Sequence, residues 1–570
     1  MMKRRILVLE GLVLAVAAGV RFCAAWSISK TGYSRHPLVD AHTYWAQATA
    51  LSSGRDPFVD GFYQPPGYPL ILSWLQQLGA SDVWGPRAVQ LSLGFLTTVL
   101  LVVLGRRIGG RKHPWFGAVS GALYTLYPST VLFELDLLTP AYTAFITVVL
   151  LLLVAPGVAK WRFFLAAVLA GLASTLHPSF LIVSVAIAAV AWLSADQKWR
   201  GVAAVLVGLF LGLMPITQAN IDRFERFKFT SNNAGINFYM GNNPDWKRTS
   251  FLRPGLPFRQ LALEAEPHKR DGFARNDYWV SRSLAGIAAE PHRWLWALAT
   301  KAVWSVSDTE IPRNEDYRCR TRAGPMQWLG FRLIRYGVVF PLAVLGVMVA
   351  WRRRPDADFA VLAWLALQVP VVVFIVADRY RMATWPMMCL LAPLGLVALR
   401  QIRVGVPALV LGVAVVLPWL PLDERTQEDP AWCAHVEGNL SYMDGDLAAA
   451  EAHYARAVTL DPSDWSAHVW LAETLARRGE VEQAIAHLDV VLMGFPDSFP
   501  TLRSAAKLHA RNGDYAAAAE LMIRAYEVPG DRTSTGVRAV RYLLRSGQDG
   551  RAREMLRRDT KLAQRWASAR

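Results

Sequence analysis

Cysteine is scarce in this sequence and forms no metal-binding pattern. The 570 residues include four cysteines, and no two of them have the CxxC spacing of a zinc site. Basic residues are more numerous, with 61 Lys and Arg against 45 Asp and Glu, but they lie in short clusters between apolar segments. The sequence therefore offers neither a zinc module nor the single basic domain that is typical of nucleic-acid binding.

The N-terminal stretch is also not expected to be a cleavable signal peptide. The apolar stretch 6–26 follows the basic start Met-Met-Lys-Arg-Arg, yet it is long and has no small-residue cleavage site. With 53% hydrophobic residues and 22 tryptophans, the composition is typical of a polytopic membrane protein. We therefore expect the stretch to be retained as the first of several membrane helices.

About eleven apolar runs reach spanning or nearly spanning length. Six short basic clusters separate them, and the positive-inside rule places all six in the cytoplasm if the N-terminus is cytoplasmic. The sequence therefore predicts an all-α, polytopic membrane helical bundle over residues 1–421. The expected helices lie at 6–26, 86–105, 114–132, 138–156, 162–177, 179–195, 201–218, 335–351, 358–377, 382–399 and 404–420.

The segment HRWLWALATKAVWSVS, residues 292–307, decides the topology of the middle of the chain. Its tryptophans suit the membrane interface, and counting it as a span would move a later basic cluster to the outer side. We therefore expect it to lie on the outer surface, which leaves loops 28–85 and 219–334 and everything after residue 421 outside. The polar residues that then share the outer side include Asp40, Glu134, Asp136, Arg379 and Arg381.

A second region begins after residue 421, where the apolar runs stop. Glycine and alanine recur there every 34 residues, the period of tetratricopeptide repeats, in which small residues lie where paired helices cross. We predict a linker at 422–431, an α-solenoid of such repeats at 432–560 and a basic tail at 561–570. We expect the solenoid to bind a protein or peptide partner, with a spacer or an oligomerisation arm as the alternative. The residues with this period are Gly445, Gly479, Gly513, Gly547, Ala450, Ala484 and Ala518.

Five polar segments of the first region follow a distinctive order. They are DAHTYW from Asp40, YQPPGYP from Tyr63, FELD from Phe133, NNAGINFYMGNNP from Asn232 and DRYR from Asp378. In their order and their expected side of the membrane, they resemble the C-type (GT-C) glycosyltransferases, and most of all the protein mannosyltransferase and aminoarabinose transferase-like group. The resemblance covers most of residues 1–420. It implies an inverting transfer of a sugar from a polyprenyl-phosphate carrier to a protein, lipid or glycan at the outer face.

The resemblance implies catalytic roles for acidic residues, because an acceptor hydroxyl must lose a proton while the sugar carbon gains oxocarbenium character. Asp40 is expected to be the general base, or to orient the acceptor through a bound ion; the alternative is an N-cap of the following helix. Glu134 is expected to be a second acid. Asp136 could be catalytic, or it could cap a helix that begins near Leu137. A divalent metal could take part, although the sequence supplies no complete ligand set.

Cationic and polar residues are expected to bind the substrates. Arg379 and Arg381 would meet the departing phosphate at the level of the lipid headgroups, with Tyr380 packed nearby and Lys301 as a weaker candidate. The alternative for the two arginines is an interfacial anchor. The segment YQPPGYP is expected mainly to fix a turn, and NNAGINFYMGNNP is expected to be a polar loop. Further sugar contacts are expected from Tyr44, Gln64, Tyr68, Asn237 and Asn242.

Two other functions compete with this one. An O-antigen ligase or polymerase can also carry such repeats, but its chemistry usually lies in a large late loop, whereas here the first outer loop carries the motifs. A non-enzymatic scaffold for envelope assembly would depend on the repeats alone. A transporter is disfavoured because the spans carry few ionisable residues. We expect the chain in the bacterial inner membrane, with its N-terminus in the cytoplasm and its repeats on the periplasmic side.

Overall fold

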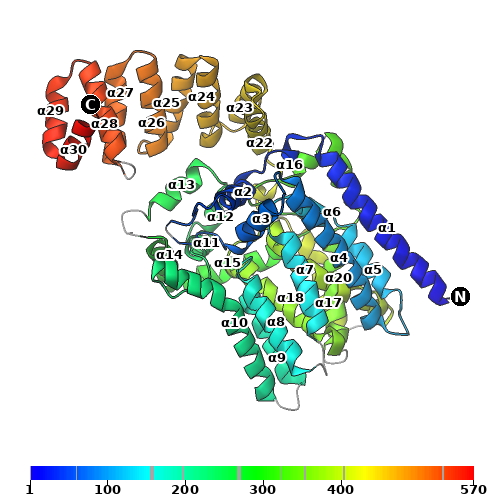
Figure 1. Ribbon diagram of the computed structural model, residues 1–570. Coiled ribbons are helices and arrows are strands. Elements are labelled where there is room, and N and C mark those ends of the chain that lie inside the picture. The colour runs from blue at the N-terminus through cyan, green and yellow to red at the C-terminus, as the bar shows by residue number, and fades with distance from the viewer. Residues whose placement is uncertain are drawn as a thin grey trace. The chain divides into compact units, whose positions relative to one another are not determined.

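The computed structural model describes residues 2–59, 61–154, 159–194, 198–265, 271–322, 324–351, 355–401, 405–528 and 532–569 (Figure 1). Every regular element within these residues is a helix, so the all-α prediction is confirmed. The chain divides into two compact units. Unit 1 comprises Met1–Phe251 and Arg270–Glu428, and unit 2 comprises Leu252–Lys269 and Asp429–Arg570.

Unit 1 contains a helix at each of the apolar runs and several shorter helices between them. Prolines begin many of these helices, because a proline in the first turn gives up no helical hydrogen bond. The α-helices of unit 1 are α1 (Met2–Ile28), α2 (Val39–Ser52), α3 (Gly67–Gln77), α4 (Trp84–Gly109), α5 (Phe116–Thr125), α6 (Pro128–Leu135), α7 (Pro140–Leu153), α8 (Lys160–Ala173), α9 (Phe180–Ser194), α10 (Lys198–Phe224), α11 (Ala234–Asn242), α12 (Trp246–Ser250), α14 (Gly272–Ala289), α15 (Pro291–Ser305), α16 (Tyr317–Thr321), α17 (Tyr336–Ala350), α18 (Pro355–Val373), α19 (Asp378–Arg381), α20 (Trp385–Ala398) and α21 (Val406–Val416).

The expected bundle of eleven spans is not confirmed. Three of the described helices, α1, α4 and α10, are long and apolar enough to cross a membrane. The number rises to five at most if each of two bent helix pairs forms one span. One such pair is α6 and α7, whose axes differ by 118°. Pro128 accounts for one of the breaks, since it cannot continue α5 and begins a new helix, and Pro140 begins α7 after α6 has already ended at Leu135.

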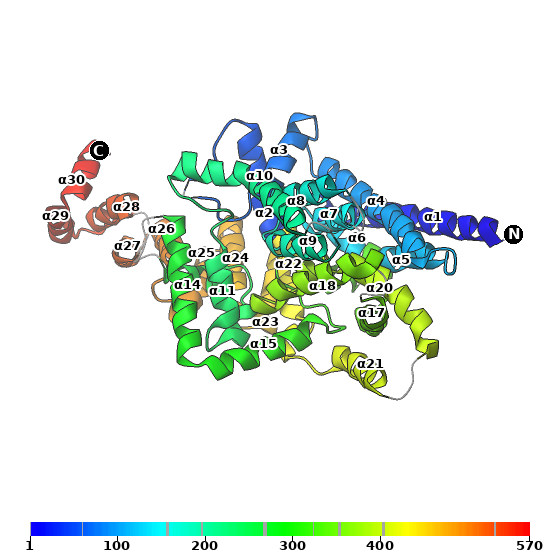
Figure 2. The ribbon, with the colours of Figure 1, turned by 90° about the horizontal axis from the view of Figure 1, so that it is seen from below.

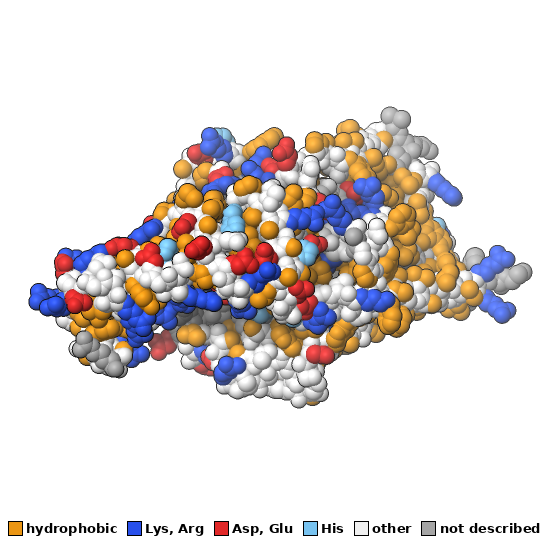
Figure 3. Space-filling model, turned by 90° about the horizontal axis from the view of Figure 1, so that it is seen from above, with side chains coloured by type: hydrophobic (Ala, Val, Ile, Leu, Met, Phe, Trp, Pro, Cys, Tyr) orange, Lys and Arg blue, Asp and Glu red, His pale blue; other side chains and the backbone are white. Residues whose placement is uncertain are grey.

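The first helix, α1, exposes an apolar surface that suits lipid. Leu12, Phe22 and Trp26 are 59%, 71% and 60% exposed. The face shown in Figure 3 is covered by hydrophobic side chains near the N-terminal end, at the right. An exposed apolar surface of this length is expected of a helix that lies in a membrane.

Glycines allow close contact between neighbouring helices of unit 1. The helix α8 lies beside α10 (Figure 2), and a Cβ atom on Gly171 would lie 2.8 Å from the Cα atom of Gly212. Between α17 and α20, a Cβ atom on Gly346 would lie 2.0 Å from the carbonyl oxygen of Leu391. Helix packing through small residues is typical of membrane proteins, where burial of apolar surface from water does not drive association.

Unit 2 repeats one helix pair along the chain, as the period of 34 residues predicts. The glycines at 445, 479, 513 and 547 have φ between 74° and 95°, a left-handed conformation that ends the first helix of each pair. The alanines at 450, 484 and 518 are fully buried between helices. The helices are α22 (Pro430–Met443), α23 (Leu447–Leu460), α24 (Trp465–Arg478), α25 (Val481–Gly494), α26 (Phe499–Arg511), α27 (Tyr515–Glu527), α28 (Arg532–Arg545), α29 (Asp549–Arg558) and α30 (Thr560–Ser568).

A segment from the expected outer loop 219–334 also belongs to unit 2. It contains α13 (Leu256–Leu263), which packs on α24. The backbone N–H of Leu256 donates to Ser466 Oγ at 3.0 Å, and Arg253 forms an ion pair of 3.1 Å with Asp429. Unit 2 is therefore completed by residues that lie far upstream of the repeats in the sequence.

Candidate functional site

Asp40 lies in the first turn of α2, but it does not cap that helix. Leu38 is the N-cap residue, and Val39 has a φ of +50°, in the left-handed region that β-branched residues avoid. Such a conformation costs on the order of 1–3 kcal/mol and persists only where the surrounding structure imposes it. The surroundings therefore fix the direction of the backbone immediately before Asp40.

Three donors from distant parts of the chain meet the Asp40 carboxylate. Arg379 in α19 donates from Nη1 to Oδ2 at 2.7 Å, and Asn314 donates from Nδ2 to the same oxygen at 2.6 Å. Gln64 donates from Nε2 to Oδ1 at 3.0 Å. Burial alone would raise the pKa of Asp40, but the charge and hydrogen bond of Arg379, with the bond from Asn314, hold it below its usual value. Asp40 is therefore ionised at neutral pH.

A small pocket adjoins this ion pair. Arg379 and Asn314, which both bind Asp40, lie on its wall, and Asp136 lies on the same wall. Carboxylates and guanidinium groups therefore border one cavity. The lining residues are Leu38, Ala41, Phe133, Asp136, Leu138, Arg313, Asn314, Glu315, Asp378 and Arg379.

Asp136 follows α6 and does not begin the next helix, which starts at Pro140. Arg320 donates from Nη1 to Asp136 Oδ1 at 2.5 Å, and its Nη2 pairs with Glu315. The Asp136 side chain keeps 18% of its surface exposed. Asp136 thus reaches the pocket as a paired carboxylate.

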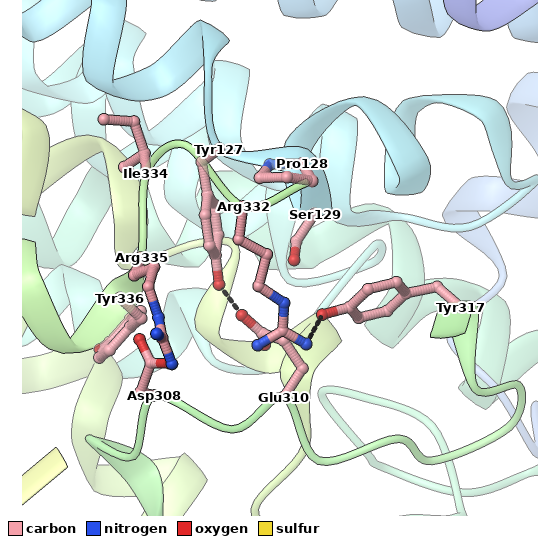
Figure 4. Close-up of a pocket in the computed structure, with 10 residues that line it drawn as sticks. All are labelled: Tyr127, Pro128, Ser129, Asp308, Glu310, Tyr317, Arg332, Ile334, Arg335 and Tyr336. Atoms are coloured by element: carbon pink, nitrogen blue, oxygen red, sulfur yellow. Dashed lines mark hydrogen bonds and ion pairs between the residues drawn. The ribbon is translucent and has the colours of Figure 1, made fainter. Parts of the chain in front are cut away.

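The segment 307–316, SDTEIPRNED, brings Arg313 and Asn314 to this pocket. Glu310 accepts a hydrogen bond from the Tyr127 hydroxyl, and Asp308 forms an ion pair of 2.6 Å with Arg335 (Figure 4). Asp308 and Glu310 therefore tie this segment to the residues that immediately precede α17 and α6. Sequence reasoning missed these residues, although the density of charges between Asp308 and Asp316 was an available signal.

The two arginines of DRYR have different partners. Arg381 pairs with Glu310 and donates to the carbonyl oxygen of Ser307, and its side chain is 2% exposed. It is not among the residues that line the pocket beside Asp40. Arg381 therefore fixes the 307–316 segment, whereas Arg379 faces the pocket and also donates from Nη2 to the Tyr380 hydroxyl at 3.0 Å.

Glu134 lies two positions before Asp136 in the sequence, but it belongs to a separate ion pair. Arg21 in α1 donates from Nε and Nη2 to the two carboxylate oxygens of Glu134 at 2.8 and 2.7 Å. The two side chains are 5% and 1% exposed. The structure does not bring Glu134 to the pocket, and it joins α1 to α6 instead.

The aromatic residues expected to contact sugar are mostly buried. Tyr68 has no exposed surface and donates its hydroxyl to Gln90 Oε1. Tyr44 packs edge-on against Tyr68, with ring centroids 5.2 Å apart. Gln64 remains beside Asp40, and its Oε1 is buried without a partner among the described residues. Among the residues expected to contact sugar, Gln64 therefore keeps a polar atom without a described hydrogen-bond partner beside Asp40.

Lys301, Asn242 and Asn237 lie in another cluster. Lys301 is 1% exposed and donates to the carbonyl oxygens of Gly241 and Phe374 at 2.9 and 3.2 Å and to Asn242 Oδ1 at 3.3 Å. Burial lowers the pKa of Lys301 to about 7. Asn237 donates to the carbonyl oxygen of Asn233 at 3.0 Å. These side chains satisfy backbone groups of the fold and do not line the pocket beside Asp40.

The expected polar loop NNAGINFYMGNNP is a helix over most of its length, α11. Its glycine at 235 allows the helix to touch α14, since a Cβ atom there would lie 2.2 Å from the carbonyl oxygen of Asn276. Contact between two helices thus overrides the weak helix propensity of glycine and asparagine. The loop prediction was wrong for this segment.

No group of three or more His, Cys, Asp and Glu side chains is arranged to hold a metal ion in the part of the chain that the structure describes. Of the carboxylates on the pocket wall, Asp136 and Glu315 pair with Arg320, whereas Asp378 accepts a hydrogen bond from the backbone N–H of Arg379.

Comparison with known proteins identifies the repeats. Residues 441–508 match the family model of the tetratricopeptide repeat, so that prediction is confirmed. No curated protein sequence is detectably similar to the chain. MamA from Desulfovibrio magneticus is similar at 15% identity and a TM-score of 0.22, over 30% of this chain and 90% of that one. The oligosaccharyltransferase of Archaeoglobus fulgidus is similar at 13% identity and a TM-score of 0.41, over 84% of this chain and 59% of that one.

Proposed function

We propose that unit 1 is a membrane glycosyltransferase that moves a sugar from a polyprenyl-phosphate donor to an acceptor on a protein, lipid or glycan. The observation that carries the proposal is the Asp40–Arg379 pair beside a pocket that Asp136 and Arg313 also line. Formation of the new glycosidic bond needs a base for the acceptor proton and positive charge for the departing phosphate. Asp40 and Arg379 supply these two groups.

Arg379 is the proposed phosphate ligand. Its Nη1 and Nη2 donate to Asp40 and Tyr380, and its Nε is buried without a partner among the described residues. A guanidinium group can bind two phosphate oxygens at once. A donor phosphate would therefore compete with Asp40 for Arg379, and the pKa of Asp40 would rise toward its usual value as the pair loosened.

In the proposed step, the acceptor oxygen attacks the anomeric carbon from the side opposite the phosphate. Asp40 takes the hydroxyl proton, and the bond between the anomeric carbon and the phosphate oxygen breaks, with its electron pair leaving on the phosphate. A single displacement of this kind inverts the anomeric configuration. Asp136 would orient hydroxyl groups in the pocket, and Gln64 would hold Asp40 in place.

Glu134 is better suited to a structural role than to the acid role expected from the sequence. Its two oxygens are both bound by Arg21, and both side chains are almost fully buried. Arg381 likewise supports the site through Glu310. We propose that both residues position the helices around the pocket without contact with the substrates.

The proposed setting is the bacterial inner membrane, with the pocket on the outer face and the N-terminus in the cytoplasm. The three candidate spans and the exposed apolar surface of α1 support a membrane location. Unit 2 would recruit the acceptor or an assembly partner through its repeats. Removal of unit 2 is then expected to impair selection of the acceptor more than hydrolytic turnover of the donor.

Mass spectrometry of envelope proteins, lipids and glycans tests the function. Cells with the intact chain are compared with cells carrying Asp40→Asn or Arg379→Gln at equal protein level. A matched control is Asp56→Asn, because Asp56 also lies in the first outer loop and pairs with an arginine, Arg223, but its side chain is 57% exposed. We expect a sugar-sized mass to disappear from one class of molecule in the first two variants and to remain in the control.

The opposite result would favour a scaffold. If both pocket variants keep every glycan while loss of residues 429–570 gives a phenotype, the repeats alone carry the function. The pocket would then be a structural ion-pair cluster.

A further inference from the structure

The repeats of unit 2 form a groove of about 970 Å³. The first helices of three successive pairs supply most of its wall, with one contribution from a second helix. The lining residues are Tyr442 from α22, Val469, Trp470, Glu473 and Arg477 from α24, Leu488 from α25, and Ser504, Lys507 and Leu508 from α26.

Part of the groove wall is apolar and aromatic. Trp470 is 39% exposed and packs edge-on against Tyr442, with ring centroids 5.2 Å apart. Leu488 and Leu508 lie on the same wall. A partly exposed tryptophan beside leucines is suited to an apolar or aromatic side chain of a partner.

Two charged residues of the groove wall, Glu473 and Arg477, balance each other. Arg477 forms an ion pair of 3.3 Å with Glu473 and lies 4.5 Å from the centroid of the Tyr442 ring. The Tyr442 hydroxyl donates to Glu473 at 3.4 Å. The carboxylate of Glu473 is thus part of the groove wall.

The groove also carries positive charge that forms no ion pair with a carboxylate among the described residues, although Glu473 is near enough to act on Lys507 electrostatically. Lys507 lies on the groove wall, and Arg503 precedes it by one helical turn on α26. Arg538 on α28 is near enough to act on Lys507 electrostatically. Burial, followed by the charges of Arg538 and Arg503, lowers the pKa of Lys507, and the charge of Glu473 partly opposes this shift. Three like charges that oppose one another in this way favour a bound anion.

We propose that this groove binds an extended acidic polypeptide segment that also carries apolar or aromatic side chains. Its carboxylates would meet Arg503, Lys507 and Arg538, and its apolar side chains would contact Trp470 and the leucines. A nucleic acid fits less well, because its continuous row of phosphates would pass the Glu473 carboxylate. The inference rests on the proposed function only in assigning partner recruitment to unit 2.

Binding to the full chain in detergent micelles tests the inference separately from catalysis. The probe is a short fluorescein-labelled peptide in which Asp and Glu alternate with Leu and Phe, and binding is followed by fluorescence anisotropy. Two comparison probes are the same peptide with Asn and Gln in place of the acids, and labelled oligothymidylate. The variant is Lys507→Glu, and its control is Arg557→Glu, which makes the same charge change at an exposed position of α29.

We expect the acidic peptide to bind at least about fivefold more tightly than the other two probes, and to weaken as salt is raised. Lys507→Glu should weaken that binding about tenfold, and Arg557→Glu should leave it unchanged. Trp470→Ala should weaken it without changing its salt dependence.

Equal binding of the acidic and neutral peptides, or tighter binding of oligothymidylate, would overturn the inference. Equal loss in Lys507→Glu and Arg557→Glu would do the same, because net charge and not the groove would then attract the probe. These results are independent of the transferase assay, since Asp40→Asn should bind the peptide like the intact chain.

Discussion

Asp40 and Arg379 lie 339 positions apart in the sequence, and an ion pair of 2.7 Å joins their side chains. Asp40 belongs to the helix that follows the first apolar stretch, and Arg379 belongs to the short helix before α20. The two side chains are 24% and 17% exposed, so each is shielded from water, and Arg379 lies on the wall of the pocket. A carboxylate in such a position needs a cation, and the pair therefore joins distant parts of unit 1 at the candidate site.

The lowered pKa of Asp40 predicts a pH-dependent contribution to stability. The folded pKa lies below the unfolded value of about 3.9, so the stabilisation is present above that value and is lost as the pH falls through the folded pKa. Asp40→Asn should lower the free energy of unfolding at pH 7 by about 1 kcal/mol, because the pair is partly exposed. The difference from the intact chain should shrink below about pH 4.

Thermal unfolding in detergent at a series of pH values measures this difference. Asp56→Asn serves as the control for a solvent-exposed pair. A destabilisation by Asp40→Asn that is constant from pH 7 to the acid limit would show that loss of the carboxylate charge is not its cause.

Asp40, Asp136 and Arg379 were selected from the sequence for a physical reason. Charged side chains next to apolar runs are costly unless they have partners or a function, so each one is conspicuous. The partners were not predictable in the same way. Arg379 and Arg381 have the same side chain two positions apart, and only the packing of segment 307–316 gives Glu310 to Arg381 and leaves Arg379 with Asp40.

In the fold, too, the features that the local sequence determines were predicted, and those that depend on contacts between distant segments were not. The period of 34 residues predicted the repeats because each glycine ends a helix through its own backbone conformation. The helix over Ala234–Asn242 was missed, because its stability comes from the contact of Gly235 with α14. The eleven expected spans depended on run length alone, and a break such as the one before Pro128, inside the expected run 114–132, is not visible in hydropathy.

Lys301 should make stability rise with pH. Its pKa is about 7 in the folded protein and about 10.4 in the unfolded chain, so the unfolded chain binds more protons between these values. The free energy of unfolding should therefore increase from about pH 7 toward pH 10, by at most about 1.4 kcal/mol per pH unit. Lys301→Met should remove that slope, whatever its effect on stability at a single pH.

Unfolding midpoints at pH 7, 8 and 9 give the slope directly. Lys247→Met is the control, because Lys247 is exposed on α12 and should leave the slope unchanged. A slope that survives in Lys301→Met would assign it to another group.

Val39 should be replaceable by glycine without loss of stability. Its φ of +50° is unfavourable for a β-branched residue and ordinary for glycine, so Val39→Gly removes strain while it adds flexibility to the unfolded chain. We expect a change in the free energy of unfolding between zero and about 1 kcal/mol of stabilisation. Val131→Gly, at a fully buried position of α6, should instead destabilise by about 2–4 kcal/mol. Comparable losses in the two variants would show that Val39 is held by its side chain and is not strained.

Gly94 should tolerate no side chain, because of the Arg21–Glu134 pair. A Cβ atom on Gly94 in α4 would lie 1.9 Å from Glu134 Oε1, and Arg21 holds both oxygens of that carboxylate. Gly94→Ala should displace the carboxylate from its partner and cost about 3 kcal/mol or more, since a buried charge is left poorly paired. Gly19→Ala in α1 has nothing within 4 Å and should be neutral or slightly stabilising.

The thermal midpoint in detergent distinguishes these two alanine variants, and a second substitution tests the cause. Glu134→Asp shortens the acid by one methylene group and makes room for the new Cβ atom. Combined with Gly94→Ala, it should recover part of the lost stability, although Glu134→Asp alone destabilises by lengthening the distance to Arg21. If the double variant is as unstable as the sum of the two single variants, the contact between Gly94 and Glu134 does not account for the loss, and close packing of α4 against α6 must account for it instead.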